Sequence, residues 1–189
     1  MALFGTTRIA INSNLYQQAS PDEVMALVGH ELGHHVLAHR AWLLLAGAVL
    51  IVAGFGFIAW GFAWSTLWFG GAWQVREVQD VAGLPLLAAW GLLFVLLATP
   101  VTAAILRQCE WQADIFAVNA VRKPDAAADM VLKQAPRHGL DALPWVEAIF
   151  QNYQPGAARI HTLMVWKKAH IGDLDLRDSA AIPFQDVRH

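Results

Sequence analysis

Two long stretches without a charged residue dominate the pattern of hydrophobic and polar positions. No Asp, Glu, Lys, Arg or His occurs in residues 41–75 or in residues 81–106. A helix that crosses the roughly 30 Å hydrocarbon core of a membrane needs about 20 apolar residues, so each stretch can span once. The pattern predicts a transmembrane helical hairpin over residues 41–106, with its first helix ending at Gly70 and Gly71.

The polar segments on either side of the hairpin have an ordinary composition. We expect residues 1–40 and 107–172 to fold together as one discontinuous domain, and residues 173–189 to form a polar tail. Residues 8–11 have the character of a short β-strand and lead into a turn.

Helix signals are clearest after this strand. Ser20 can cap a helix, Pro21 suits its first position and Glu23 completes a capping box. This helix should run through at least His39. Pro100 should bend the second membrane helix or break its last turns. Further helices are expected over residues 108–121, 125–134, 141–151 and 157–169.

Composition supports a membrane protein. Hydrophobic residues make up 57% of the chain and charged residues 15%, against about 45–50% and about 25% in a typical soluble domain. A net charge of −2 without a basic block argues against nucleic acid as a partner. The lone Cys109 excludes an intramolecular disulfide. The alternative to a membrane hairpin is a helical hairpin buried in a large soluble assembly.

The distribution of basic residues predicts the orientation. Every Lys and Arg except Arg76 lies before residue 41 or after residue 106. The positive-inside rule therefore places the Arg76 loop outside and both termini in the cytoplasm. We expect an integral protein of a bacterial inner or cytoplasmic membrane. Residues 1–20 contain no apolar run typical of a signal peptide, so the first membrane helix should direct insertion.

The strongest chemical signal is the motif His30-Glu31-Leu32-Gly33-His34. Helix positions i and i+4 lie on one face about one turn apart, which suits two imidazole ligands of a tetrahedral zinc ion. Glu31 lies about 100° round the helix from His30, near such a metal without having to bind it. It can therefore take the proton of a zinc-bound water that attacks a carbonyl. The alternative is a chance match on a histidine-rich helix.

A catalytic zinc needs a third protein ligand. The downstream candidates are Glu110, Asp114, His138, Glu147 and His161. An antiparallel hairpin returns the chain close to where it entered the membrane, so topology favours Glu110 and Asp114, which share one helix face. The alternative is that this charged pair lies on a solvated surface.

Two further histidines follow the motif. His35 lies about 100° round the helix from His34 and points away from the metal face. His39 lies near the membrane boundary. Both are expected to be structural rather than metal ligands.

These motifs, in this order, resemble the family of membrane zinc metallopeptidases that contains the type I CAAX prenyl endopeptidases and the HtpX-like quality-control proteases. Residues 4–9 are similar to the family's strand before the active site, and residues 20–39 to its zinc helix. The segment Glu110-Trp111-Gln112-Ala113-Asp114-Ile115-Phe116-Ala117 is similar to the family's E-x-x-A-D-x-F-A segment. The resemblance covers nearly the whole chain up to about residue 160.

The resemblance implies a ligand set and a fold class. Glu110 would be the third ligand of one Zn²⁺ per chain, and Asp114 would orient a zinc-bound histidine. The fold class expected is mainly α, with the membrane hairpin joined to a small cytoplasmic zincin-like helical domain that includes the short N-terminal strand.

The chain departs from the family pattern late in the sequence. The family has a His-Pro pair followed by Arg-Ile, with the His and the Arg facing the active site. This chain keeps Arg159-Ile160 but has no histidine there: counting back from Arg159 gives Tyr153, and counting from Pro155 gives Gln154. Tyrosine could donate a hydrogen bond to a developing oxyanion, so Tyr153 and Arg159 are candidate catalytic residues.

A second departure concerns the start of the chain. Family members carry one or more membrane helices and further polypeptide before the strand, whereas this chain begins at the strand. We therefore expect a minimal member, a fragment that lacks an N-terminal segment, or a form that depends on a partner subunit.

The leading hypothesis is a zinc-dependent membrane endopeptidase acting on a peptide or protein substrate. Prenylated tails and misfolded membrane proteins are equally compatible substrates. The alternative is a catalytically inactive or partner-dependent membrane scaffold of the same fold. An intramembrane site-2-type protease is disfavoured, because that class needs an Asp ligand inside a spanning helix and neither uncharged stretch contains one.

Overall fold

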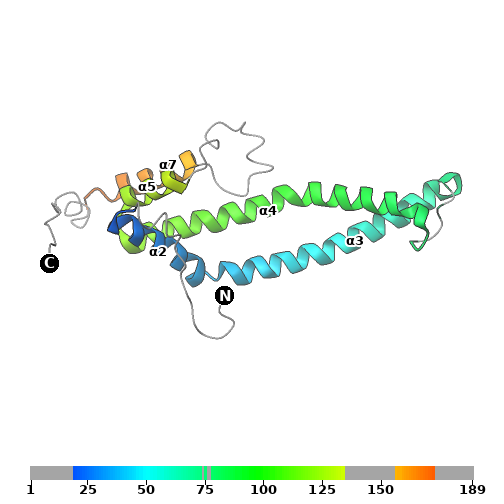
Figure 1. The fold of residues 1–189 in the computed structure, drawn as a ribbon, viewed down its shortest axis with the longest axis horizontal. Helices are drawn as coiled ribbons and strands as arrows, with labels where there is room; N and C mark the ends of the chain where they lie inside the picture. Colours follow the sequence, from blue (N-terminus) through cyan, green and yellow to red (C-terminus); the bar gives the residue numbers. More distant parts are fainter. Residues whose placement is uncertain (1–18, 74, 76–77, 135–155, 173–189) are drawn as a thin grey trace.

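The computed structural model describes residues 19–73, 75, 78–134 and 156–172, and these are mainly helical (Figure 1). The helices are α2 (Pro21–Val36), α3 (His39–Trp73), α4 (Leu84–Val121), α5 (Pro124–Gln134) and α7 (Gly156–Ala169), with a 3₁₀ turn η1 at Val81–Gly83. No strand occurs in the described ranges. The strand expected at residues 8–11 and the helix expected at residues 141–151 lie outside them.

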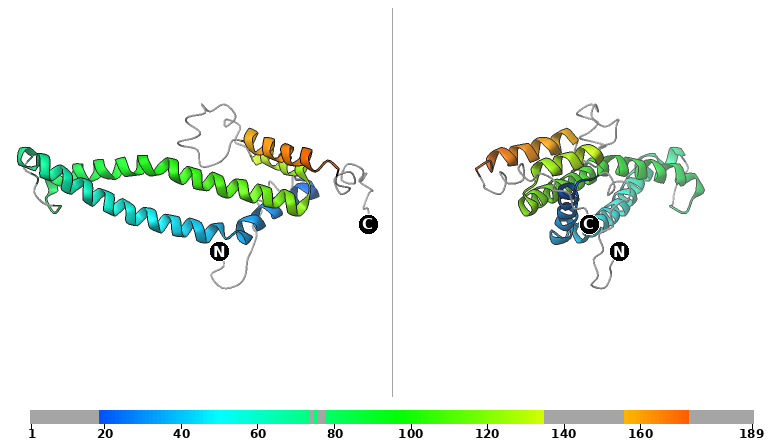
Figure 2. Two further views of the ribbon diagram at one scale, coloured as in Figure 1. Left: turned by 180° about the vertical axis from the view of Figure 1, so that it is seen from behind. Right: turned by 60° about the vertical axis from the view of Figure 1, so that its left-hand side comes forward.

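Helices α3 and α4 run antiparallel and form a long hairpin that projects from the other helices (Figures 1 and 2). Both are long and apolar enough to cross a membrane. Their outward-facing apolar side chains are covered by no other part of the described structure: Val52, Leu67 and Leu92 are 73%, 80% and 72% exposed. Since so large an apolar surface is stable beside lipid and not in water, the hairpin has the character of a membrane-spanning unit.

The two helices of the hairpin meet where a small residue faces a large ring. A Cβ added to Gly61 would overlap the indole of Trp90, and one added to Gly54 would lie 2.8 Å from the ring of Phe94. The Trp90 indole N–H donates a 3.0 Å hydrogen bond to Ser65 Oγ, one turn further along α3. Both glycines are therefore required by close approach of the helices rather than by turns.

Helix α4 corrects the prediction that Pro100 could break the last turns of the second membrane helix and that a separate helix covers residues 108–121. A single helix runs from Leu84 to Val121 through Pro100. Nearby hydroxyls support it, since Thr99 Oγ1 donates to the Val95 carbonyl at 2.7 Å and Thr102 Oγ1 to the Thr99 carbonyl at 2.8 Å. In an apolar setting a helix is the only way to satisfy the remaining backbone groups, and this favours continuation.

Two other boundaries also differ from the sequence prediction. Helix α3 continues through Gly70 and Gly71 to Trp73, because glycine in an apolar helix costs less than exposing its backbone to lipid. The helix that begins at Pro21 ends at Val36 instead of running through His39. Ala38 adopts a left-handed backbone with φ 53°, and this starts a new helix, α3, at His39.

The start of α2 is as predicted. Ser20 Oγ accepts from the Glu23 N–H at 3.3 Å, and the Glu23 carboxylate accepts from the Ser20 N–H at 2.7 Å. Glu23 also accepts two hydrogen bonds from Lys133 Nζ, which tie α2 to α5. Burial opposes ionisation of Glu23, but the bonds from Lys133 and Ser20 outweigh it and hold its pKa below the usual value.

Helices α5 and α7 confirm the helices expected near residues 125–134 and 157–169. They pack with the last turns of α4 around a small core made of Val118, Ala128, Val131 and Leu163. The polar helices therefore gather at one end of the hairpin (Figure 2).

Candidate metal centre

Small residues bring helix α2 against the polar end of α4. A Cβ on Gly29 would lie 3.4 Å from the Ala117 Cα, and one on Gly33 would lie 3.2 Å from the Ala113 Cα. Both alanines are buried. Because glycine on α2 faces alanine on α4 at these two positions, the helix backbones approach closely and the histidines of α2 reach the acidic residues of α4. The signal for this packing is present in the sequence as small residues four apart on both helices.

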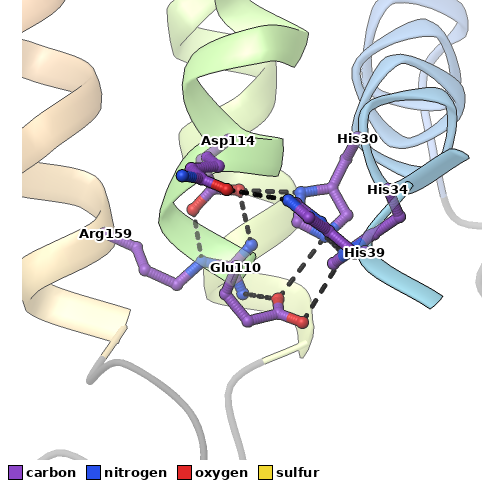
Figure 3. A network of polar contacts seen from close by, with 7 residues as sticks. His30, His34, His39, Glu110, Asp114 and Arg159 are labelled. Carbon is purple, nitrogen blue, oxygen red and sulfur yellow. Dashed lines mark hydrogen bonds and ion pairs between the residues drawn. The ribbon is translucent and has the colours of Figure 1, made fainter. Parts of the chain in front are cut away.

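The histidines and one acidic residue form a compact triangle (Figure 3). His30 Nε2 lies 3.2 Å from His34 Nε2. The Glu110 carboxylate faces both rings, with one oxygen 3.5 Å from His30 Nε2 and the other 3.5 Å from His34 Nε2. These three residues make up the group of potential metal ligands found among the described residues.

The dimensions of the triangle suit zinc. Ligand atoms about 2.0–2.2 Å from a tetrahedral ion stand about 3.3–3.6 Å from one another. The two imidazole nitrogens are 3.2 Å apart, and each lies 3.5 Å from a different oxygen of the Glu110 carboxylate, so the three side chains converge at about this spacing. Two imidazoles and a carboxylate are also the donor types that zinc accepts, and three ligands leave a fourth position for water or substrate. The side chains of His30, His34 and Glu110 therefore fit a zinc ion.

The outer nitrogen of His30 is held by a carboxylate. His30 Nδ1 lies 2.9 Å from Asp114 Oδ1. Arg159 of α7 donates two hydrogen bonds to the same carboxylate, from Nε to Oδ2 at 2.7 Å and from Nη2 to Oδ1 at 2.6 Å. Its Nη1 lies 3.8 Å from Glu110. Arg159 thus joins α7 to the two acidic residues of α4.

These contacts set the charge of the site. Burial disfavours protonation of His30, but the hydrogen bonds to Asp114 and Glu110 outweigh burial and raise its pKa from 6.5 to about 9. Burial and the neighbouring His30 charge lower the pKa of His34. Burial favours the neutral forms of Glu110 and Asp114. The hydrogen bonds and charges of His30 and Arg159 outweigh burial, so the net pKa of each carboxyl group is lowered. Both carboxylates are therefore ionised at neutral pH.

Comparison with known proteins decides the family. The family model of Peptidase family M48 matches residues 2–167 of the chain. The chain belongs to Peptidase family M48. The family resemblance inferred from the motifs is thereby confirmed, and the match includes both the histidine motif and Glu110.

Individual relatives agree with this assignment. The chain is 26% identical over 174 residues to a CAAX prenyl protease 1 homolog of Oryza sativa subsp. japonica, covering 85% of this chain and 38% of that protein. It is 27% identical over 126 residues to a protease HtpX homolog of Streptococcus uberis, covering 62% of this chain and 40% of that protein. It thus spans less than half the length of these M48 relatives. No solved structure matches it.

Some of the other candidate residues of this M48 chain lie within the described part of the structure, and others lie outside it. Glu31 is exposed on α2, close enough to His34 for its charge to act on that ring. His35 and His161 are exposed and stand apart from the triangle. The remaining candidates lie outside the described residues: His138, Glu147, Tyr153 and Gln154.

His39 has a larger part in the site than the sequence indicated. It is 3% exposed. Its Nδ1 lies 2.9 Å from His34 Nδ1, and its Nε2 lies 2.9 Å from Gln112 Oε1. Sequence reasoning missed this contact because it depends on the break at Ala38, which turns the first residue of α3 back towards α2.

Proposed function

We propose that this chain is a zinc-dependent membrane endopeptidase with one Zn²⁺ held by His30, His34 and Glu110. The observation that carries the proposal is the convergence of two imidazole nitrogens and one carboxylate in a chain of family M48, although His34 and Glu110 are 76 residues apart in the sequence. Glu110 in place of a third histidine would make the centre a gluzincin-type site.

The side chains around the triangle have distinct tasks. Zinc, when bound, would lower the pKa of a water and polarise the scissile carbonyl. The exposed Glu31 carboxylate accepts the proton of the attacking water and passes it to the leaving amine nitrogen. Asp114 keeps His30 in place through its Nδ1. Arg159 is a positioning residue, since two of its nitrogens are engaged by Asp114.

The position of the centre relates the reaction to the membrane. His39 is the first residue of α3, and Glu110 follows the uncharged part of α4 by four residues. At 1.5 Å per residue this is about 6 Å of helix. We place the centre at the membrane surface, on the cytoplasmic side, where the discontinuous polar domain of residues 1–40 and 107–172 would surround it. Its substrate is a peptide segment presented at that surface.

Proteolysis in detergent tests the proposal. The purified chain should cleave casein or a reporter peptide, lose this activity with a chelator and regain it with zinc. Glu31→Gln should keep zinc but lower cleavage by at least about 10²-fold, because the amide cannot accept a proton. His35→Gln, an exposed neighbour, is the matched control and should behave as the wild type. Wild-type cleavage in Glu31→Gln would contradict the mechanism. A chain that binds zinc but cleaves nothing would favour the scaffold alternative.

A further inference from the structure

The break between α2 and α3 places a second histidine behind the metal triangle. If α2 continued unbroken, position 39 would lie about 140° round the helix from position 34, facing elsewhere. Instead Ala38 adopts φ 53°, a left-handed conformation that is unfavourable for a residue other than glycine. The turn places the buried His39 ring against His34.

The hydrogen bonds of His39 form a chain with a direction. A carbonyl oxygen only accepts, so Gln112 Oε1 accepts a hydrogen bond from the N–H at His39 Nε2. A neutral imidazole with a proton on Nε2 has a bare Nδ1. That bare nitrogen, 2.9 Å away, accepts from His34 Nδ1. His34 must then carry its proton on Nδ1, which leaves the lone pair of its Nε2 directed at Glu110 and His30.

If the hydrogen bonds between Gln112, His39 and His34 ran in the opposite direction, His34 could not bind a metal through Nε2. If the Gln112 amide nitrogen faced His39, each proton in the chain would move to the other ring nitrogen. His34 would then carry its proton on Nε2, and that nitrogen could not bind a metal. The acceptor at Gln112 therefore decides whether His34 can be a ligand.

We propose that His39, held by Gln112, is a positioning residue that fixes the tautomer of His34 and so presents its Nε2 as a ligand atom. The inference rests on the metal centre of the proposed function and deepens it. His30 and His34 are then held in the same manner: Asp114 of α4 binds the outer nitrogen of His30, and His39, held by Gln112 of α4, binds that of His34.

The tautomer can be measured on the metal-free protein, without any activity assay. In ¹⁵N NMR of the imidazole rings, wild-type His34 should show a protonated Nδ1 and a bare Nε2. His39→Phe keeps a ring of similar size but has no acceptor, so this preference should be lost. His39→Asn should restore it, since its amide oxygen can stand near the place of Nδ1. A protonated Nε2 on His34 in the wild-type protein would overturn the proposal.

Zinc affinity, measured by competition with a chelator, gives the second readout. His39→Phe and Gln112→Met should weaken zinc binding about 10–100-fold, the usual loss when a ligand's hydrogen-bond partner is removed. His39→Asn should recover most of that loss. His35→Phe is the control, because this exposed histidine follows His34 directly and is not among the potential ligands. The variant should bind zinc as the wild type does.

The result separates this proposal from the metal centre on which it rests. Wild-type zinc affinity in His39→Phe, with weak binding in Glu110→Ala, would overturn the role of His39 and leave the centre intact. Wild-type affinity in Glu110→Ala would contradict the centre itself. Weakened zinc binding in His39→Phe together with a changed His34 tautomer supports the proposal.

Discussion

Each histidine of the triangle uses one ring nitrogen for the shared centre and the other for a fixed partner. For His30 the partner is the Asp114 carboxylate, which accepts two hydrogen bonds from Arg159. Holding the outer nitrogen fixes both the orientation and the tautomer of a ligand, and typically accounts for a 10–100-fold difference in metal affinity. At the scale of single residues, the site is therefore defined as much by its partners as by its ligands.

The raised pKa of His30 predicts how metal binding depends on pH. In the metal-free protein this pKa is about 9, so His30 is protonated at pH 7 and zinc must displace that proton. Zinc affinity should rise about tenfold per pH unit from pH 6.5 to 8.5 and level off above pH 9. Titration calorimetry at several pH values, in buffers of different ionisation enthalpy, measures the released proton. Affinity that is flat across this range would contradict the His30–Asp114 pair.

The raised pKa of His30 makes the stability of the metal-free protein fall with rising pH, whereas it makes zinc affinity rise. Because the folded pKa is raised, the pair stabilises the fold fully below about pH 6.5, and this contribution is lost as the pH rises through about 9. Asp114→Asn, which removes the charge that raises the pKa, should shift both pH profiles to lower pH. This variant is the matched control for the prediction on zinc affinity.

Local spacing explains which residues could be predicted from sequence. His30, Glu31 and His34 stand in one motif, and helix geometry alone places the two imidazoles on one face. Glu110 needed the hairpin topology and the family resemblance, because it meets the histidines from a distant segment. The contact of His39 could not be predicted, since it depends on a left-handed Ala38 that no sequence signal marks.

At the scale of helices, the hairpin depends on close contact between α3 and α4. Gly61→Ala adds a Cβ that overlaps the Trp90 indole, and the ring cannot move without disturbing its hydrogen bond to Ser65. The free energy of unfolding in detergent should fall by about 1–3 kcal/mol. Gly56→Ala, on the same helix with open space around it, should be neutral or stabilising by up to about 1 kcal/mol. Equal effects of the two substitutions would contradict this packing.

The helices also show where patterns mislead. The start of α2 follows from Ser20, Pro21 and Glu23, whose capping box is local. Pro100 does not end the helix, because rules drawn from helices in water underestimate how strongly an apolar environment preserves a helix. The packing of α2 on α4 required recognising Gly29 and Gly33 as one half of an interface whose other half lies far along the chain.

For the whole molecule, charge-free length was sufficient to predict the hairpin, and the distribution of basic residues predicts its orientation. Gln79→Cys, in the short connection between α3 and η1, should react in intact cells with a thiol reagent that cannot cross membranes. Ser179→Cys, in the C-terminal segment, should react only after the cells are opened. The wild-type chain gives the background, since Cys109 is buried. Labelling of both positions in intact cells, or of Ser179→Cys alone, would contradict the orientation.

The central claim is that His30, His34 and Glu110 hold one zinc ion, and zinc content per chain tests it most directly. Elemental analysis after dialysis against a weak chelator should find about one zinc in the wild type and in His161→Ala, whose histidine is exposed and outside the triangle. Glu110→Ala leaves two ligands and should lose most of its zinc. Full zinc content in Glu110→Ala, with loss in His161→Ala, would contradict both the ligand set and the site built around it.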